Sequence, residues 1–234
     1  MAQHAIVTGG GSGVGRAVAL RLAQQGWCIA VLGQQIKALE DTAALADPGA
    51  ILPEPCDVSN PAEVAHLRDR LMSQWDGVDA LVNAAGTNVP RRALADVSVE
   101  DFTRVLAVNL LGAFHLVQAF LPSMRGRERA TIVNVISDAG LVANAKAGSA
   151  YVASKFGMSG LIESINAELR GEGIRGTAIY PGDIDTPFLD KRPVPPDAQA
   201  RSLMLKPEDV ADCVMLAINL PHRAVLEKLV VRPR

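Results

Sequence analysis

Tyr151 and Lys155 are the two residues whose types and spacing most directly suggest chemistry. A tyrosine four residues before a lysine places both side chains on one face of a helix, one turn apart. A phenol is a poor acid or base near neutrality because its reference pKa is about 10. A nearby ammonium favours the phenolate, so we expect Lys155 to lower the pKa of Tyr151 towards the range of general acid–base catalysis. The pair alone is weak evidence, because the same spacing occurs by chance in many helices.

A glycine-rich turn at residues 8–15, Thr-Gly-Gly-Gly-Ser-Gly-Val-Gly, gives the pair a context. The turn follows a short apolar strand and opens a helix, which is the setting that a nucleotide-binding turn requires. Gly9, Gly13 and Gly15 permit a tight turn and let backbone N–H groups approach a pyrophosphate at the helix N-terminus. Arg16 and Ala17 follow in place of Lys-Ser/Thr, so the turn is not a P-loop. In isolation it could be only a sharp strand–helix corner.

Composition limits the possible function classes. The 234 residues are 49% hydrophobic and 21% charged, the balance of an ordinary globular protein. A net charge of −2 and an aromatic content of 4% argue against a nucleic-acid-binding surface, which needs basic residues and stacking platforms. The one local basic cluster, residues 125–129, is expected to be a solvated loop before a strand rather than an anion site.

Metal binding, disulfide formation and membrane insertion are not expected. Cys28, Cys56 and Cys213 are widely spaced and lack a Cys-x-x-Cys pattern, so we expect reduced, mostly buried thiols. The four histidines have no metal-ligand spacing. We find no signal peptide before the first expected strand and no apolar run long enough to span a bilayer. The sequence therefore predicts a cytoplasmic protein with no membrane partner.

Strand-like and helix-like segments alternate along the whole chain. Strands that are apolar on both faces, joined by helices, predict a parallel sheet covered by helices on both sides. The expected fold is a doubly wound, Rossmann-type α/β sheet forming a single domain over 1–234, with its site at the carboxyl ends of the strands. The expected strands lie at 5–7, 28–32, 50–52, 79–83, 131–136, 176–180 and 229–231, and the expected helices at 14–25, 36–46, 61–74 (capped by Asn60), 99–124, 150–171 and from 207.

The 187–206 segment differs in composition because four of its residues are prolines close together. It could be a plain surface connection or a mobile lid over a substrate cleft. Its position directly after the sixth expected strand favours the lid.

Several motifs in a fixed order make the chain resemble the short-chain dehydrogenases/reductases over nearly its whole length. The resemblance implies an oxidoreductase that binds NAD or NADP and acts on a small alcohol or carbonyl compound. The matching motifs are the turn at 8–15, Asp57 with Val58, Asn-Ala-Ala-Gly at 83–86, Asn109, Ser137, Tyr151 with Lys155, and Pro-Gly-Asp-Ile-Asp-Thr at 181–186.

The resemblance assigns catalytic roles to Asn109, Ser137, Tyr151 and Lys155. Lys155 would hold the nicotinamide ribose and lower the pKa of Tyr151, which exchanges a proton with the substrate oxygen as hydride moves. Ser137 would donate a hydrogen bond to the same oxygen, and Asn109 would anchor a water in a proton relay behind Lys155. Separately, Ser137 could cap a turn, Asn109 could satisfy a helix irregularity and Tyr151 could be half-buried packing. All four together at family spacing favour the catalytic interpretation.

The resemblance also implies a set of cofactor contacts. Asp57 would contact the adenine, Ile184 and Thr186 the nicotinamide carboxamide, and Asn83 would brace the sheet by backbone hydrogen bonds. Phe188 could equally be core or a wall of the substrate site. The full set comprises Gly9, Ser12, Gly13, Val14, Gln34, Asp57, Val58, Asn83, Ala84, Gly86, Tyr151, Lys155, Pro181, Gly182, Ile184 and Thr186.

The choice between NAD and NADP is open at this stage. An acidic residue at the end of the second strand bonds the 2′-hydroxyl of NAD, whereas arginine pairs with the 2′-phosphate of NADP. This chain has Gly33, Gln34 and Gln35 there, and Ser12 at the other position that is often basic in NADP users. A glutamine amide can serve either form, and Lys37 would favour NADP if its side chain reaches the site.

Two departures from the family pattern bear on the substrate. Ser137 and Tyr151 are fourteen residues apart, one more than expected, and the extra residue falls in the loop 144–148 beside the expected substrate site. The chain ends in Leu-Val-Val-Arg-Pro-Arg rather than Val-Asp-Gly-Gly. This ending is more similar to members that oxidise small hydroxy acids and hydroxyamino acids than to acyl-carrier-protein ketoreductases.

Two helices are apolar on more faces than a surface helix needs, so part of their surface should meet another subunit. Relatives form dimers and tetramers through these helices, and we expect a homodimer or homotetramer. The alternative is that these residues only face the sheet. They are Val105, Val108, Leu110, Leu111, Phe114, Leu116, Val117, Phe120 and Leu121 on the first helix, and Ala153, Phe156, Gly157, Met158, Gly160, Leu161, Ile162 and Ile165 on the second.

The sequence therefore predicts an NAD(P)-dependent oxidoreductase acting on a secondary alcohol or ketone, possibly a small hydroxy acid. A ketoacyl or general carbonyl reductase is the alternative among enzymes. A nucleotide-sensing regulator with the same fold is the alternative outside them, although such a sensor has no need of all four catalytic residues.

Overall fold

A seven-stranded parallel sheet forms the centre of the protein, with the strand order β3-β2-β1-β4-β5-β6-β7. The computed structural model describes residues 2–234. All strand pairs are parallel, as in β1 beside β2 and β4 beside β5. This topology confirms the predicted Rossmann-type α/β fold. The strands are β1 (His4–Thr8), β2 (Cys28–Gly33), β3 (Ile51–Pro55), β4 (Ala80–Asn83), β5 (Thr131–Val135), β6 (Arg175–Pro181) and β7 (Lys228–Val231).

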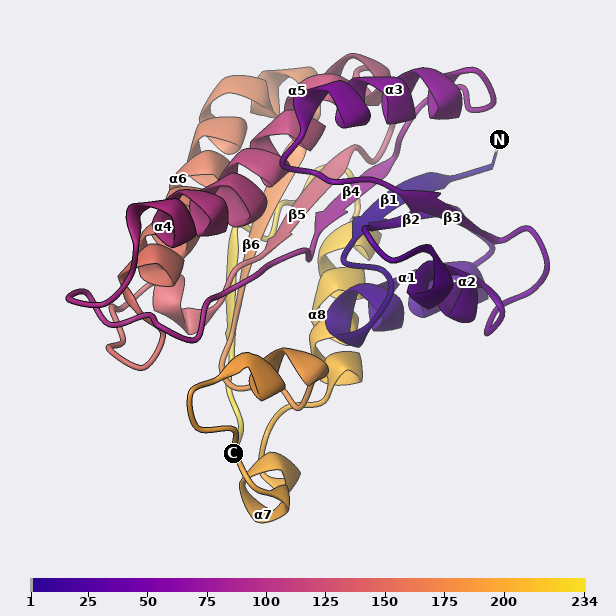
Figure 1. The fold of residues 1–234 in the computed structure, drawn as a ribbon. Coiled ribbons are helices and arrows are strands. Elements are labelled where there is room, and N and C mark those ends of the chain that lie inside the picture. The colour runs from indigo at the N-terminus through magenta and orange to yellow at the C-terminus, as the bar shows by residue number, and fades with distance from the viewer. Residues whose placement is uncertain (1) are drawn as a thin grey trace.

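Helices cover both faces of the sheet, as Figure 1 shows: α3, α4, α5 and α6 lie on one side and α1, α2 and α8 on the other. Each face has its own apolar core, and β1, β2, β4 and β5 contribute side chains to both. Strands buried on two faces need the continuous apolar runs that the sequence contains. The helices are α1 (Gly13–Gln24), α2 (Ile36–Ala43), α3 (Pro61–Met72), α4 (Val99–Leu106), α5 (Gly112–Met124), α6 (Ser149–Leu169), α7 (Ala198–Ser202) and α8 (Pro207–Asn219).

Element boundaries differ from the predicted ones mainly at β3 and α2. The third strand was expected to end at residue 52, but β3 continues through Pro53 to Pro55. Prolines are tolerated there because β3 is an edge strand and pairs only with β2. The second helix was expected to reach residue 46 and ends at Ala43. The predicted cap of α3 is present, since the Asn60 side chain accepts a hydrogen bond from the backbone N–H of Ala62.

The helix that runs from Val99 to Met124 contains a π-helical turn over Ala107–Leu111 between α4 and α5. Its 26 residues are long and apolar enough to match a membrane span by length and composition, so the expectation that no such run exists was wrong. In the fold, Val105, Leu116 and Phe120 of this helix are fully buried, so one side of the helix lies in the protein interior. Buried core helices satisfy the same criterion as membrane spans, so this match is weak evidence for a membrane.

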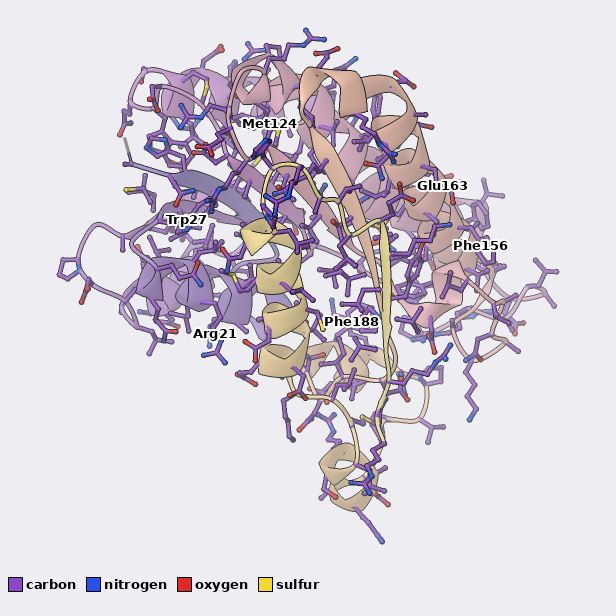
Figure 2. The ribbon with its side chains drawn as sticks, turned by 180° about the vertical axis from the view of Figure 1, so that it is seen from behind. Arg21, Trp27, Met124, Phe156, Glu163 and Phe188 are labelled. Atoms are coloured by element: carbon purple, nitrogen blue, oxygen red, sulfur yellow. The ribbon has the colours of Figure 1, made fainter. Side chains whose placement is uncertain are left out.

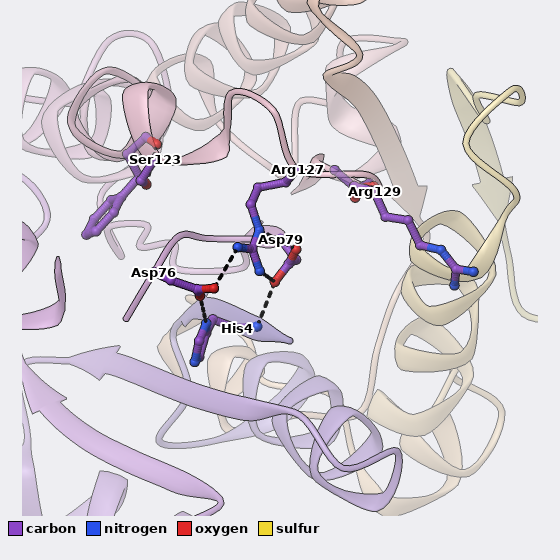
Figure 3. A network of polar contacts seen from close by, with 8 residues as sticks. His4, Asp76, Asp79, Ser123, Arg127 and Arg129 are labelled. Atoms are coloured by element: carbon purple, nitrogen blue, oxygen red, sulfur yellow. Dashed lines mark hydrogen bonds and ion pairs between the residues drawn. The ribbon is translucent and has the colours of Figure 1, made fainter. Parts of the chain in front are cut away.

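Residues 125, 126, 128 and 129 of the basic cluster are exposed, as predicted for a solvated loop, but Arg127 is part-buried and structural. Arg127 makes a two-pronged ion pair with Asp79, with Nε–Oδ1 and Nη2–Oδ2 distances of 2.8 and 2.9 Å. The backbone N–H of His4 donates to the same carboxylate, and Asp76 lies near both Arg127 and His4 (Figure 3). This network ties β1, β4 and the loop after α5 together at the amino end of the sheet.

The 187–206 segment has two fixed ends. Ile184 and Leu205 form a parallel bridge, in which Leu205 N donates to Asp183 O and Asp185 N donates to Leu205 O. Between these points the chain forms a short 3₁₀ helix, Pro187–Lys191, and then α7, which projects away from the sheet in Figure 1. The segment is thus a closed loop anchored beside the carboxyl end of β6.

Candidate active site

The glycine-rich turn is held against the loop after β4 by a side chain. Thr8 Oγ1 accepts hydrogen bonds from the backbone N–H groups of Ala84 and Ala85, at 2.9 and 2.8 Å. The turn needs its glycines: Gly9 has a φ of 67°, and a Cβ at Gly15 would lie 2.4 Å from the carbonyl oxygen of Gly9. Two predicted cofactor-binding segments, 8–15 and 83–86, are therefore neighbours.

The N-terminus of α1 is open towards this turn. Ser12 occupies the N-cap position, but its side chain makes no capping hydrogen bond. Gly13 has a φ of 51°, and a Cβ on it would lie 3.2 Å from the Thr186 side chain. The turn and the segment 181–186 therefore lie side by side.

These features fit a dinucleotide. Uncapped N–H groups at a helix N-terminus attract a phosphate, and glycines leave space for it where side chains would intrude. Gly9, Gly13 and the start of α1 would hold the pyrophosphate. Gly86 would leave space near the catalytic groups, since a Cβ on it would lie 3.6 Å from Asn109 Oδ1 and 3.8 Å from Lys155 Nζ.

Ser137 stands at the carboxyl end of β5 in an unusual backbone conformation. Its φ of 154° with ψ of 157° makes it the one non-glycine residue with a positive φ among residues 2–234. A side-chain-bearing residue seldom adopts this conformation, which costs about 1–3 kcal/mol and tends to occur at functional sites. Its hydroxyl also accepts a hydrogen bond from Ala139 N and donates to Asp138, so the alternative of a turn cap describes part of its contacts.

Tyr151 and Lys155 lie one turn apart on α6, and Lys155 Nζ is 5.5 Å from the centre of the Tyr151 ring. Burial raises the pKa of Tyr151 to about 12, although a hydrogen bond with Ser137 opposes the rise. The expectation that the ammonium lowers this pKa was therefore wrong for the protein alone. The largest cause is desolvation of the phenol, which outweighs the lowering of this pKa by Ser137 and by the charges of Arg192 and Arg92.

Lys155 itself is 3% exposed. Its ammonium donates to the carbonyl oxygen of Val135 at 3.2 Å and contacts the sulfur of Met158 at 3.4 Å. Because burial disfavours the charged form and no carboxylate is among these partners, the pKa of Lys155 falls to about 7. This lysine can gain or lose its proton near neutral pH.

Asn109 occupies the π-helical turn and is almost fully buried. Its amide donates to Thr87 O and to Ser154 Oγ, and its oxygen accepts from Thr87 N at 2.7 Å. The side chain thus links the helix, the loop after β4 and α6. The predicted role in a water relay stays a prediction.

Asn83 braces the sheet through a different partner from the one expected. Its side-chain amide donates to Asn134 Oδ1 on the neighbouring β5 at 2.9 Å, a contact between side chains rather than with backbone. Its side chain is buried between the strands. Asn83 therefore shapes the floor of the site.

The end of β2 faces Asp57. The amide of Gln34 donates to Asp57 Oδ2 at 2.8 Å, and Asp57 Oδ1 accepts from Ser59. Lys37 is exposed and pairs with Asp41 one turn further along α2, which disfavours the expected reach to the site. Val58 is buried, and its carbonyl oxygen lies 3.0 Å from the His115 ring.

The predicted catalytic residues and the glycine-rich turn lie together where the carboxyl ends of the central strands meet. Residues 3–195 match the family model of the short chain dehydrogenases. The chain belongs to this family. It is therefore an oxidoreductase of a family that acts on CH–OH donors, as the sequence predicted.

This short-chain dehydrogenase is similar to two proteins named as dehydrogenases and to one named as a reductase. It is 35% identical to a D-beta-hydroxybutyrate dehydrogenase of Rhizobium meliloti over 220 residues, covering 92% of this chain and 83% of the relative. The closed form of serine dehydrogenase complexed with NADP+ superposes with a TM-score of 0.90 at 28% identity, covering 99% and 95% of the two chains. A 3-ketoacyl-(acyl-carrier-protein) reductase of Brucella melitensis complexed with NADH gives 0.88 at 26% identity, covering 98% and 96%.

Phe188, for which the sequence left core and substrate wall open, tilts against Tyr151 with ring centres 6.0 Å apart, which favours the wall. Three other residues near the site were not identified from the sequence. Asn134 and Ser154 are the partners of Asn83 and Asn109. Arg92, in the loop after β4, is buried near Tyr151 and belongs to no family motif quoted above. It is identified only by its contacts with the carbonyl oxygens of Lys146 and Lys191, which are distant in the sequence.

Proposed function

We propose that this protein is an NAD(P)-dependent dehydrogenase that interconverts a secondary alcohol and a ketone. The observation that carries the proposal is the strained backbone of Ser137 at the end of β5, together with the buried Lys155, whose ammonium lies 5.5 Å from the centre of the Tyr151 ring. When bound, the cofactor supplies the hydride acceptor for oxidation or the hydride donor for reduction.

The protein's own side chains exchange a proton with the substrate oxygen and stabilise the charge that develops on it. In reduction, Tyr151 donates its phenolic proton to that oxygen, and a pKa of about 12 keeps the phenol protonated for this step. Ser137 stabilises the developing negative charge by a hydrogen bond. Lys155, with a pKa of about 7, returns a proton towards Tyr151, and Asn109 fixes the helix and loop around it.

We infer a preference for NAD over NADP. Gln34 and Ser12 carry no charge, and the Gln34 amide holds the Asp57 carboxylate at the edge of the expected adenosine site. Arg16 donates hydrogen bonds to Gly11 O and to Thr42 Oγ1, while Lys37 forms an ion pair with Asp41. A 2′-phosphate would therefore meet the Asp57 carboxylate, and Arg16, which bonds two uncharged acceptors, is the one cation of these groups left to attract it.

A small hydroxy acid is the substrate class that the relatives support best, because one is named a hydroxybutyrate dehydrogenase and another a serine dehydrogenase. A carbonyl reductase is the alternative, supported by the similar ketoacyl reductase. We place the enzyme in the cytoplasm, in keeping with its three unpaired cysteines. The 187–206 segment would serve as the lid of a single domain.

We also propose a homodimer or homotetramer formed through α5 and α6. Leu111 and Phe114 at the first of these helices and Phe156 on the second are exposed, and Phe156 stands at the outer edge of α6 in Figure 2. Gly157 already packs against Leu110, whereas Gly160 faces open space where a second subunit could approach. Sedimentation analysis of the purified protein tests this assembly.

The test of the catalytic proposal compares the two tyrosines of the chain. Tyr151→Phe should reduce turnover about 100-fold or more, because it removes the proton donor, while NADH still binds. Tyr180→Phe is the matched control, since it removes a buried hydroxyl on β6 that lies outside the proposed site. Activity retained by Tyr151→Phe would overturn the assignment. NADH binding without turnover of any hydroxy acid or ketone by the wild type would favour the nucleotide-sensing regulator.

A further inference from the structure

Arg92 is a buried cation with no carboxylate among its partners. Its side chain lies in the loop after β4, and the residue is 8% exposed. Nε donates to Val89 O at 2.8 Å and Nη2 to Lys191 O at 2.9 Å, while Nη1 lies at 3.5 Å from Lys146 O. A guanidinium has five N–H donors, so these contacts leave two of them available. A buried charge without a counter-ion is costly and needs an explanation.

Arg175 provides an internal comparison, because it is also buried, at 6% exposure, and also lacks a carboxylate. Its guanidinium is saturated: it bonds Thr131 through two nitrogens and reaches four backbone carbonyls around the end of α8. The carbonyl dipoles at a helix C-terminus account for that cation. Arg92 has neither a helix end nor a full set of acceptors.

Arg92 is positioned at the substrate side of Tyr151. Its Nη2 hydrogen bond to Lys191 O ties it to the 3₁₀ helix that also carries Phe188, the residue in contact with the Tyr151 ring. The loop 144–148 closes over it, since a Cβ at Gly148 would lie 2.6 Å from Arg92 Cβ. The charges of Arg192 and Arg92 both lower the pKa of Tyr151, against the larger effect of burial.

Arg192 is the second cation at this place. It follows Lys191 directly, so the Arg92 hydrogen bond fixes the backbone from which Arg192 extends. Its guanidinium is paired with Asp183, and its side chain is 33% exposed. A part-exposed ion pair is weak, so a ligand anion can replace Asp183 at little cost.

We propose that Arg92 and Arg192 form a carboxylate-binding subsite beside Tyr151, so that the substrate is a hydroxy acid rather than a neutral alcohol. A guanidinium binds a carboxylate through two parallel hydrogen bonds, and two of them would fix the acid group while Tyr151 and Ser137 hold the reacting oxygen. The subsite rests on the proposed dehydrogenase function for its catalytic meaning, but anion binding by the two arginines does not require turnover.

The experiment compares 3-hydroxybutyrate with its methyl ester as substrates, because the ester removes the charge and keeps the alcohol. The wild type should have a higher kcat/KM for the acid. Arg192→Gln and Arg92→Lys should lower that value about 10-fold or more, the usual scale for losing a charged hydrogen bond, and leave the ester nearly unchanged. Lys191→Gln and Arg91→Gln are matched controls, since each removes an exposed neighbouring charge.

A second readout uses binding alone: acetoacetate should raise the Tm of the cofactor-loaded wild type more than methyl acetoacetate does, and Arg192→Gln should lose this difference. Arg192 is part-exposed, so this variant should fold even if Arg92→Lys does not. Equal kcat/KM values for acid and ester in the wild type would overturn the subsite and leave the dehydrogenase proposal standing. Acetoacetate stabilisation that depends on Arg192 without turnover of either alcohol would support the subsite while contradicting the proposed reaction. A Tm difference and an acid preference that both survive Arg192→Gln would overturn the subsite.

Discussion

At the amino end of the sheet, Arg127 makes two hydrogen bonds to the Asp79 carboxylate and an ion pair with Asp76. At the carboxyl end, by contrast, Lys155 and Arg92 bond only carbonyl oxygens and a sulfur. Arg127 therefore has its counter-charges within the chain (Figure 3), whereas Lys155 and Arg92 have none among their hydrogen-bond partners. A buried charge that is compensated internally stabilises the fold, while one left uncompensated is available to a ligand. The difference separates a cation that links segments of the fold from the cations for which we propose a role towards cofactor or substrate.

A substitution at the amino end should strongly destabilise the fold. Arg127→Met should lower the free energy of unfolding by about 3 kcal/mol, because it leaves the buried Asp79 carboxylate without its partner. The kinetic constants of the folded variant should stay close to those of the wild type. Urea unfolding with parallel kinetics measures both, and Arg129→Met, at an exposed neighbouring arginine, is the control. Loss of cofactor binding at unchanged stability would contradict the division between the two ends.

The pH dependence of stability tests the carboxyl end. The pKa of Lys155 is lowered from 10.5 to about 7 in the folded protein, so between these values the unfolded chain binds more protons. Stability should therefore rise with pH over this window, by up to about 1.4 kcal/mol per pH unit, and the full cost of the buried ammonium applies below pH 7.

The pKa of Tyr151 is raised from 10.0 to about 12, so stability should fall again as the pH passes from 10 to 12. Chemical unfolding of the wild type and of Lys155→Met across this range measures the slope that Lys155 contributes. If both proteins show the same rise between pH 7 and 10, Lys155 is compensated after all and the comparison fails.

The smallest expected effect concerns the edge of the cofactor site. Gln34→Arg places a permanent charge beside Asp57 and should shift the ratio of NADPH to NADH affinity about 10-fold towards NADPH. Fluorescence titration with each nucleotide gives the ratio, and Gln35→Arg at the adjacent exposed position is the control. A wild type that already binds NADPH more tightly would contradict the inferred preference for NAD.

The sequence contained enough information for the fold and for the motif residues, because both depend on local order. Alternating apolar strands and helices specify a parallel sheet, and its carboxyl edge collects whatever follows each strand, as Ser137 follows β5. Asn109 reaches the same region from the π-helical turn of the helix that covers the sheet. Residues whose role arises from burial could not be found in this way. Arg127 has a partner far away in the sequence, and the pKa of Tyr151 depends on desolvation that no spacing reveals.

Arg92 and Asn134 illustrate the same limit. Each contacts a segment many residues away, and nothing in its sequence neighbourhood marks it. The full length of the third strand was also not predictable from the local sequence, because prolines argue against a strand unless its position at the sheet edge is known.

The bridge between Ile184 and Leu205 has a consequence for how substrate enters. A loop whose ends are already joined has lost its closure entropy during folding, so a ligand that orders its interior need not supply that part of the cost. If the segment acts as the proposed lid, it would turn about this bridge and carry Phe188 and Arg192 together. In that case, binding of the substrate's charge and shielding of its reacting oxygen from water would be one event.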